Sequence, residues 1–177
     1  MIKLHDLEFE PYISEEEINL AIDKVAQKLN EDYLDANPIF LGVLNGSFMF
    51  ASEVIKRFSG NCEVSFVKLG SYQGTRTTGN VKTLLGLNQS LKGREIILLE
   101  DIVDTGNTLE EINKILEKEQ VNNYEVASLF YKPEAYKKDF NIKYKGIEIP
   151  NKFIVGYGLD YDGLGRNLTQ VYKRKEK

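Results

Sequence analysis

The sequence predicts an α/β fold, in which a central, mostly parallel β-sheet of about five strands is flanked by helices. Apolar runs of strand length alternate along the chain with segments whose apolar residues recur at helical spacing. Several of these runs are continuously apolar, which is typical of strands that helices cover on both faces. A length of 177 residues and a hydrophobic content of 42% suffice for one domain with a substantial core.

The first part of the chain predicts a helix, a buried strand and a second helix. Ser14–Glu17 reads as a capping box, and apolar residues follow at helical spacing as far as Leu29. After an Asn-Pro break, the run 39–44 predicts a buried strand, and 48–58 predicts another amphipathic helix. The small-residue turn 45–47 between them is a second candidate for anion binding, although most such turns only connect elements.

Further strands are predicted on either side of the centre of the chain. They cover 62–69, 81–87, 124–131 and a short segment at 152–155. The loop 70–79 contains three glycines and has no apolar periodicity. It is either a mobile lid or a long hairpin connection, and the sequence leaves both open.

The stretch 95–109, EIILLEDIVDTGNTL, is where we expect the chemistry. Ile96–Leu99 predicts a strand buried on both faces, and Glu100 and Asp101 follow at its carboxyl end. Open α/β sheets bind their ligands at this end. The turn 104–108 can then present backbone N–H groups and hydroxyls at the start of a helix, where unpaired donors and the helix dipole favour anions.

Composition excludes several other classes of function. The net charge of −4 argues against general binding of nucleic acid, and no run of about 18 apolar residues predicts a membrane span. One cysteine, Cys62, cannot form an internal disulfide, and no apolar signal region is present, so we expect a cytosolic protein. His5 has no second metal ligand nearby. We expect the KRKEK tail, 173–177, to be frayed and solvated.

The central stretch resembles the phosphoribosyl pyrophosphate signature of type I phosphoribosyltransferases, an acidic pair followed by Asp-Thr-Gly-x-Thr. Four further blocks are similar to the hypoxanthine-guanine branch and occur in the family's order: Leu44–Ser47, Ser71-Tyr72, ASLFYK up to Lys132, and Ile149–Leu168. The resemblance implies the type I phosphoribosyltransferase fold, with one domain over 1–177. Its core would cover about 39–130, and the N-terminal segment and 131–168 would form a small hood for a purine base.

The resemblance also implies a reaction, in which a purine nitrogen replaces pyrophosphate on C1 of phosphoribosyl pyrophosphate. Glu100 and Asp101 would hold the ribose hydroxyls beside an oxocarbenium-like transition state, and Asp104 would accept or relay the proton of purine N7. Helix-start acidity is the alternative for the acidic pair, and helix capping for Asp104. The 5′-phosphate would lie in a cradle made by Thr105, Gly106, Asn107 and Thr108, where Gly106 allows close approach.

The purine would be read by three residues of the second half of the chain. Lys132 resembles the lysine that donates to the 6-oxo group, and it would reject adenine, whose 6-amino group is no acceptor. Phe153 would stack on the ring, with a purely packing role as the alternative, and the backbone of Ile154 would meet the purine edge. Ser71 and Tyr72 would form the lid that excludes water.

The remaining implied contacts concern pyrophosphate and Mg²⁺. Arg166 would bind pyrophosphate together with Asn45 and Gly46. Many relatives carry lysine in place of Asn45, so only the backbone contribution of this turn is carried over. Relatives often hold the peptide bond at this turn in cis, which the sequence alone does not reveal. Asp160 resembles the Mg²⁺ ligand, and the acidic pair, Glu100 and Asp101, adds two candidate ligands.

As a hypothesis, the chain is therefore a purine salvage enzyme that converts hypoxanthine, and guanine, with phosphoribosyl pyrophosphate to IMP or GMP and pyrophosphate. The resemblance further implies a homodimer or homotetramer. One alternative is a phosphoribosyltransferase that prefers xanthine or guanine. The other is a non-catalytic regulator that retains the fold and the nucleotide pocket.

Overall fold

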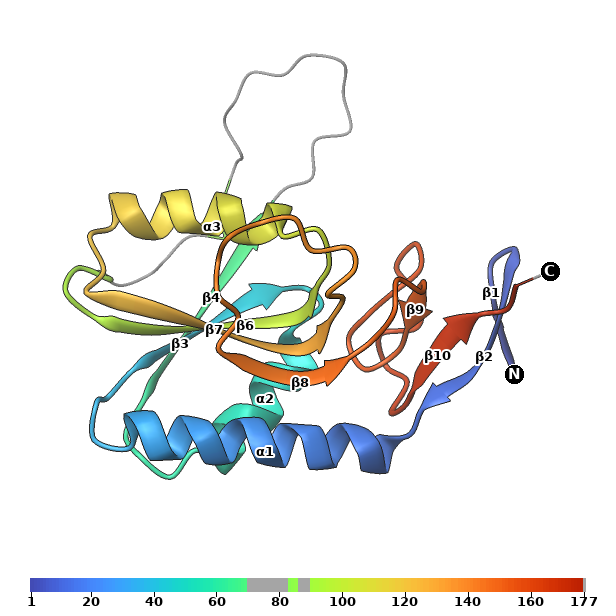
Figure 1. Cartoon of the computed structure of the whole chain (residues 1–177), viewed down its shortest axis with the longest axis horizontal. Coiled ribbons are helices and arrows are strands. Elements are labelled where there is room, and N and C mark those ends of the chain that lie inside the picture. Colours follow the sequence, from blue (N-terminus) through green and yellow to red (C-terminus); the bar gives the residue numbers. More distant parts are fainter. Residues whose placement is uncertain (70–82, 86–89, 177) are drawn as a thin grey trace, which may run out of the picture.

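The computed structural model describes residues 1–69, 83–85 and 90–176, and it contains a large sheet covered by helices beside a small sheet (Figure 1). The large sheet has the strand order β5-β4-β3-β6-β7-β8. Its strands are β3 (Ile39–Leu44), β4 (Glu63–Leu69), β5 (Thr83–Leu85), β6 (Glu95–Val103), β7 (Asn123–Tyr131) and β8 (Tyr144–Glu148). All neighbours pair in parallel except β5, which is antiparallel to β4. The predicted mostly parallel α/β fold is confirmed.

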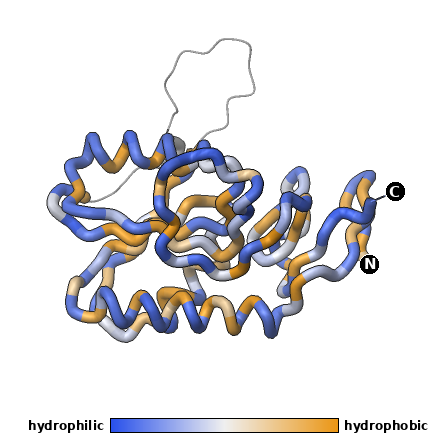
Figure 2. The backbone as a smooth tube through the Cα atoms, viewed as in Figure 1, coloured by the Kyte–Doolittle hydropathy of each residue, from blue (hydrophilic) through white to orange (hydrophobic). Residues whose placement is uncertain are grey.

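Helices lie on both faces of the large sheet, with α1 (Glu15–Tyr33) and α2 (Phe48–Arg57) on one face and α3 (Asn107–Lys118) on the other (Figure 1). The strands alternate between two cores accordingly. In β6, Ile97 and Leu99 pack toward α1 and α2, whereas Ile96 and Leu98 pack toward α3. This arrangement explains the uninterrupted apolar run, because both faces of the strand are buried. Figure 2 shows hydrophobic stretches along the strands of this sheet.

The small sheet joins the two ends of the chain, in the order β1-β2-β10-β9. Its strands are β1 (Ile2–Leu4), β2 (Leu7–Ile13), β9 (Ile154–Val155) and β10 (Val171–Arg174). The hood was expected from the N-terminal segment and 131–168. Within 131–168, β8 belongs to the large sheet, and the small sheet also includes β10, which lies beyond residue 168.

Several expected elements differ in the structure. The tail is not frayed as far as Lys175: Lys173 and Arg174 pair with β2, and the N–H of Lys175 donates to the carbonyl of Glu8 at 2.9 Å. The central strand does not end at Leu99 but continues to Val103, because its pairing with β7 runs that far. The proposed lid loop 70–79 lies outside the described residues, and of the predicted strand 81–87 only β5 is described. Strands β1, β2, β8 and β10 had not been expected.

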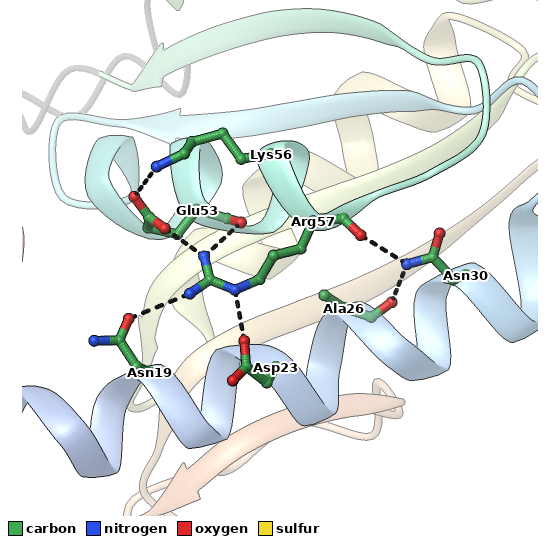
Figure 3. A network of polar contacts seen from close by, with 7 residues as sticks. All are labelled: Asn19, Asp23, Ala26, Asn30, Glu53, Lys56 and Arg57. Carbon is green, nitrogen blue, oxygen red and sulfur yellow. Dashed lines mark hydrogen bonds and ion pairs between the residues drawn. The ribbon is translucent and has the colours of Figure 1, made fainter.

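A polar network fixes α1 to α2 (Figure 3). The Arg57 guanidinium donates to Asp23 at 2.6 Å and to Asn19 at 3.3 Å, and it also binds Glu53 within α2. In return, the Asn30 side chain donates to the carbonyl of Arg57 at 2.9 Å. The network holds α1 and α2 together on one face of the sheet.

No helix in the described part of the chain is long and apolar enough to cross a membrane.

Truncation of a core residue of α1 tests this packing. Leu29 is completely buried, so Leu29→Ala leaves a cavity, and we expect a loss of about 2–5 kcal/mol in the free energy of unfolding. Leu34, at the end of the same helix, is 46% exposed, so Leu34→Ala should change stability by no more than about 0.5 kcal/mol. Urea unfolding at one fixed protein concentration measures both. Equal losses in the two variants would contradict the assigned packing of α1.

Candidate active site

A hollow of about 300 Å³ opens where β3 and β6 end side by side. Parallel pairing places the carboxyl ends of these strands at one edge of the sheet, where the loops that follow can meet. The lining comes from three places: the end of β3 with Gly46, Leu69 of β4, and the continuous stretch Glu100–Leu109. The hollow therefore contains both predicted acids of β6 and the whole predicted phosphate turn.

The loop after β3 packs directly against Asp101. The peptide bond between Leu44 and Asn45 is cis, the Asn45 residue is exposed, and Gly46 is buried. A Cβ atom on Gly46 would lie 1.6 Å from Asp101 Oδ2, so no larger residue fits here without displacing the carboxylate. Gly46 thus permits the contact between this loop and β6.

Glu100 is a buried acid without a partner. Its residue is 3% exposed, and Oε1 has no hydrogen-bond partner among the described residues. Burial, and then the neighbouring Asp101, raise the pKa of Glu100 well above its ordinary value. A buried polar atom without a partner is costly in a folded protein, so this atom is suited to a polar ligand in the hollow.

Asp101 also resists ionisation. Burial raises the pKa of Asp101 to about 6, although the backbone N–H of Ile102, 3.0 Å from Oδ1, acts in the opposite direction. The charges of Arg166 and Asp160 act on this pKa with opposite signs, which places both within electrostatic reach. Neither acid lies at a helix start, since both belong to β6, and that alternative is wrong.

The turn after β6 starts α3 at Gly106. Gly106 is the N-cap residue with φ of 87°, and no side chain caps the helix. Asp104 is therefore not the cap, and the capping alternative is wrong. A Cβ on Gly106 would lie 2.7 Å from side-chain atoms of Tyr136 and Lys138, so the glycine is needed both for its backbone conformation and for this close packing. Within this turn, Thr105, Asn107 and Thr108 are exposed.

Asp104 forms an ion pair with Lys132, which follows β7. The Lys132 Nζ lies 2.8 Å from Asp104 Oδ2 and 3.5 Å from Asn151 Oδ1. The Lys132 side chain is only 7% exposed, whereas that of Asp104 is 43% exposed. The ammonium group is thus held at the margin of the hollow, with its charge directed at one carboxylate.

Asp160 and Arg166 form a second ion pair, at 2.6 Å. Arg166 also donates to the carbonyl of Gly158 at 2.7 Å, and the N–H of Gly163 donates to Asp160 at 2.7 Å. A Cβ on Gly158 would lie 2.0 Å from the carbonyl oxygen of Gly46. The loop with this pair therefore rests on the loop after β3.

Phe153 lies apart from these residues. It is 45% exposed, makes no part of the first hollow, and lines a second hollow of about 900 Å³ in the small sheet. Its ring centroid is 6.1 Å from that of Phe9 and 5.8 Å from that of Tyr161. Ile154 is buried, and its backbone in β9 pairs with Lys173 of β10. Asn151 lines the second hollow and accepts from Lys132, whose ion-pair partner Asp104 lines the first hollow.

Three residues near the site had no assigned role from sequence. Asn151 lies two positions before Phe153, which was its only signal. Tyr136 and Lys138 cover Gly106 from a loop without periodicity, so only the tertiary structure reveals them. The expected lid residues Ser71 and Tyr72 lie outside the described residues.

The raised pKa of Asp101 predicts a pH dependence of stability. Between about pH 4 and pH 6 the unfolded state ionises this group first, so the folded state loses stability as pH rises through that window. Asp101→Asn removes this loss. Its free energy of unfolding, relative to that of wild type, should therefore rise by roughly 1–3 kcal/mol between pH 4 and pH 7.

Chemical denaturation in metal-free buffer at both pH values measures the gain. The exposed Asp35→Asn is the control and should show no such trend. A pH-independent difference between Asp101→Asn and wild type would contradict the burial of this charge.

Comparison with known proteins agrees with this geometry. The family model described as phosphoribosyl transferase domain matches residues 13–162. A hypoxanthine-guanine phosphoribosyltransferase of Streptococcus agalactiae is 41% identical over 165 residues, covering 93% of this chain and 92% of the relative. One of Staphylococcus epidermidis is 39% identical over 160 residues, covering 90% and 89%.

The fold is likewise similar to a solved structure. The crystal structure of a hypoxanthine phosphoribosyltransferase from Staphylococcus aureus superposes with a TM-score of 0.87 at 37% identity, covering 96% of this chain and 92% of that one. From the match over most of its length, the chain belongs to the phosphoribosyl transferase family, in the hypoxanthine-guanine branch.

Proposed function

We propose that this protein transfers the phosphoribosyl group of phosphoribosyl pyrophosphate to hypoxanthine, and to guanine, in purine salvage. The products are IMP or GMP and pyrophosphate. The observation that carries the proposal is the Asp104–Lys132 pair beside a hollow lined by two acids with raised pKa values and a helix start. The names of the relatives from Streptococcus agalactiae and Staphylococcus epidermidis support the same activity.

The sugar phosphate occupies the first hollow. The 5′-phosphate lies at the turn 105–108, because the first N–H groups of α3 are not taken by a capping side chain. Glu100 and Asp101 face the ribose hydroxyls, which donate to the unpartnered Glu100 oxygen. As the bond from C1 to pyrophosphate breaks, positive charge develops on the sugar, and these carboxyl groups stabilise it.

The purine binds between Asp104 and Lys132, and each of the two side chains then forms a hydrogen bond to the base. Its 6-oxo group accepts a hydrogen bond from Lys132, and its N7–H donates to Asp104. When N9 bonds to C1, the N7 proton passes to the Asp104 carboxylate, and pyrophosphate leaves with the electrons of the broken bond. Asn151 remains beside the ammonium group while Asp104 takes part in the reaction.

The base lies toward the second hollow, where Phe153 supplies an exposed aromatic face and the Ile154 backbone borders it. On the opposite side, Arg166 and the backbone at Asn45 and Gly46 bind pyrophosphate. In the free protein Arg166 is paired with Asp160, so pyrophosphate competes for this guanidinium. Ser71 and Tyr72 retain their proposed role as a lid.

A magnesium ion fits this site if the substrate supplies most of its ligands. The described residues contain no cluster of three or more groups that could hold a metal by themselves. Mg²⁺ commonly binds through one or two carboxylates together with substrate phosphates. Asp160, Glu100 and Asp101 offer such carboxylates, and the bound ion would neutralise charge on the leaving pyrophosphate. The cytosolic location, the homo-oligomeric state and the absence of nucleic-acid binding stay predictions.

A substrate panel tests the assignment. Purified protein with phosphoribosyl pyrophosphate and Mg²⁺ should convert hypoxanthine and guanine, and chelation of Mg²⁺ should abolish turnover. Adenine should be rejected by a factor of about 10⁴ in kcat/KM, because its 6-amino group offers the Lys132 ammonium no acceptor. Nucleotide formation, followed by chromatography, also includes xanthine and so decides the xanthine-preferring alternative. Absence of turnover with all four bases would favour the regulator.

Asp104→Asn tests the proton acceptor. The amide keeps the shape of the side chain but cannot take the N7 proton, so kcat for hypoxanthine should fall about 10²- to 10⁴-fold. Asp35→Asn removes an exposed carboxylate that does not line the hollow, and it should leave kcat unchanged. Circular dichroism should show both variants folded. An Asp104→Asn enzyme with the wild-type kcat would remove Asp104 from this role.

A further inference from the structure

A third ion pair lies on the outer side of the phosphate turn. The Lys138 Nζ lies 2.8 Å from Glu110 Oε2, with side chains 24% and 43% exposed. Glu110 belongs to the first turn of α3, whereas Lys138 comes from the loop after Lys132. The chemistry proposed above gives neither residue a role.

Glu110 creates an electrostatic conflict at this helix start. A carboxylate in the first turn stabilises the helix dipole, but it has the same sign as a bound phosphate. Glu110 follows Asn107 by three residues, which corresponds to about 4.5 Å along the helix axis. This separation is shorter than the screening length of about 8 Å at physiological ionic strength. Without a neutralising partner, Glu110 would repel the phosphate.

The structure holds Lys138 in place to neutralise this charge. Its stem passes over Gly106, where a Cβ would lie 2.7 Å from Lys138 Cγ. The preceding backbone is attached to the same turn, because the N–H of Lys137 donates to the carbonyl of Thr105 at 3.4 Å. The ammonium group therefore reaches Glu110 from an anchored segment rather than from a free surface side chain.

A separate observation shows that this hollow is suited to a polar ligand. The Glu100 oxygen without a partner lines the same hollow as the turn 105–108. We propose that Lys138 is a further determinant of sugar-phosphate affinity, acting by neutralising Glu110 at the start of α3. This inference rests on the proposed function, which places the 5′-phosphate at that turn.

The test uses a charge-removal cycle. Lys138→Met keeps the stem over Gly106 but exposes the Glu110 charge, and it should raise KM for phosphoribosyl pyrophosphate about 3- to 10-fold. The KM for hypoxanthine and kcat should stay within about twofold of wild type. Adding Glu110→Gln to Lys138→Met removes the repulsion and should restore KM to within about twofold. The effect should shrink at high salt.

The amino-terminal edge of the large sheet, opposite the site, offers a matched control. Lys143 Nζ pairs with Asp32 Oδ2 at 2.9 Å, where α1 ends and β8 begins. Lys143→Met and its combination with Asp32→Asn should leave KM for phosphoribosyl pyrophosphate unchanged. Melting temperatures of all variants, measured in parallel, separate loss of stability from loss of affinity.

Three outcomes overturn the inference. An unchanged KM in Lys138→Met shows that Glu110 does not affect the phosphate. A KM that stays raised in the double variant shows that neutralisation of Glu110 is not the cause. Binding of ribose 5-phosphate by calorimetry, across the same variants, tests the cycle independently of turnover. Absent purine turnover with an intact cycle rejects the proposed function alone, and absent binding to wild type rejects the inference.

Discussion

The site depends on one electrostatic constraint: a chain of net charge −4 gathers carboxylates where the proposed substrate, which has several phosphates, would approach. The structure meets this constraint in two ways. Acids near the surface are paired with cations: Asp104 with Lys132 of another strand end at 2.8 Å, and Asp160 with Arg166 of the same loop at 2.6 Å. The acidic pair inside β6 instead has raised pKa values, because burial disfavours its charge. The free site therefore carries less negative charge than its composition suggests.

Parallel strand pairing makes these ion pairs possible. Val103 and Tyr131 are register partners at the ends of β6 and β7, so the next residues of both strands, Asp104 and Lys132, leave the sheet side by side. The backbone N–H of Lys132 donates to the carbonyl of Val103 at 3.0 Å and continues the alignment. A charge pair separated by 28 residues in sequence is thus set by a strand register rather than by a flexible loop.

The sequence predicted what depends on local pattern. The buried strand at Ile96–Leu99, the turn that follows it and the helices on either side arise from periodicity and turn residues, and the structure has them, whereas strands β1, β2, β8 and β10 were not predicted. Features that depend on partners distant in sequence could not be predicted. The Lys173 segment looked frayed because its partner strand β2 begins at Leu7. Lys138 had no signal because its role arises only where its loop crosses Gly106.

The relative positions of the charged side chains depend on two glycines, which have no side chain. Gly46 lies against the Asp101 carboxylate, and Gly158 lies against the carbonyl of Gly46. The loop that starts at Gly158 continues to Asp160 and receives a hydrogen bond from Arg166. The distance between Asp101 and Asp160 is therefore set by the direct backbone contact of Gly46 with Gly158. Because backbone is less free to move than side chains, this stacking fixes the positions of Asp101, Asp160 and Arg166 relative to one another.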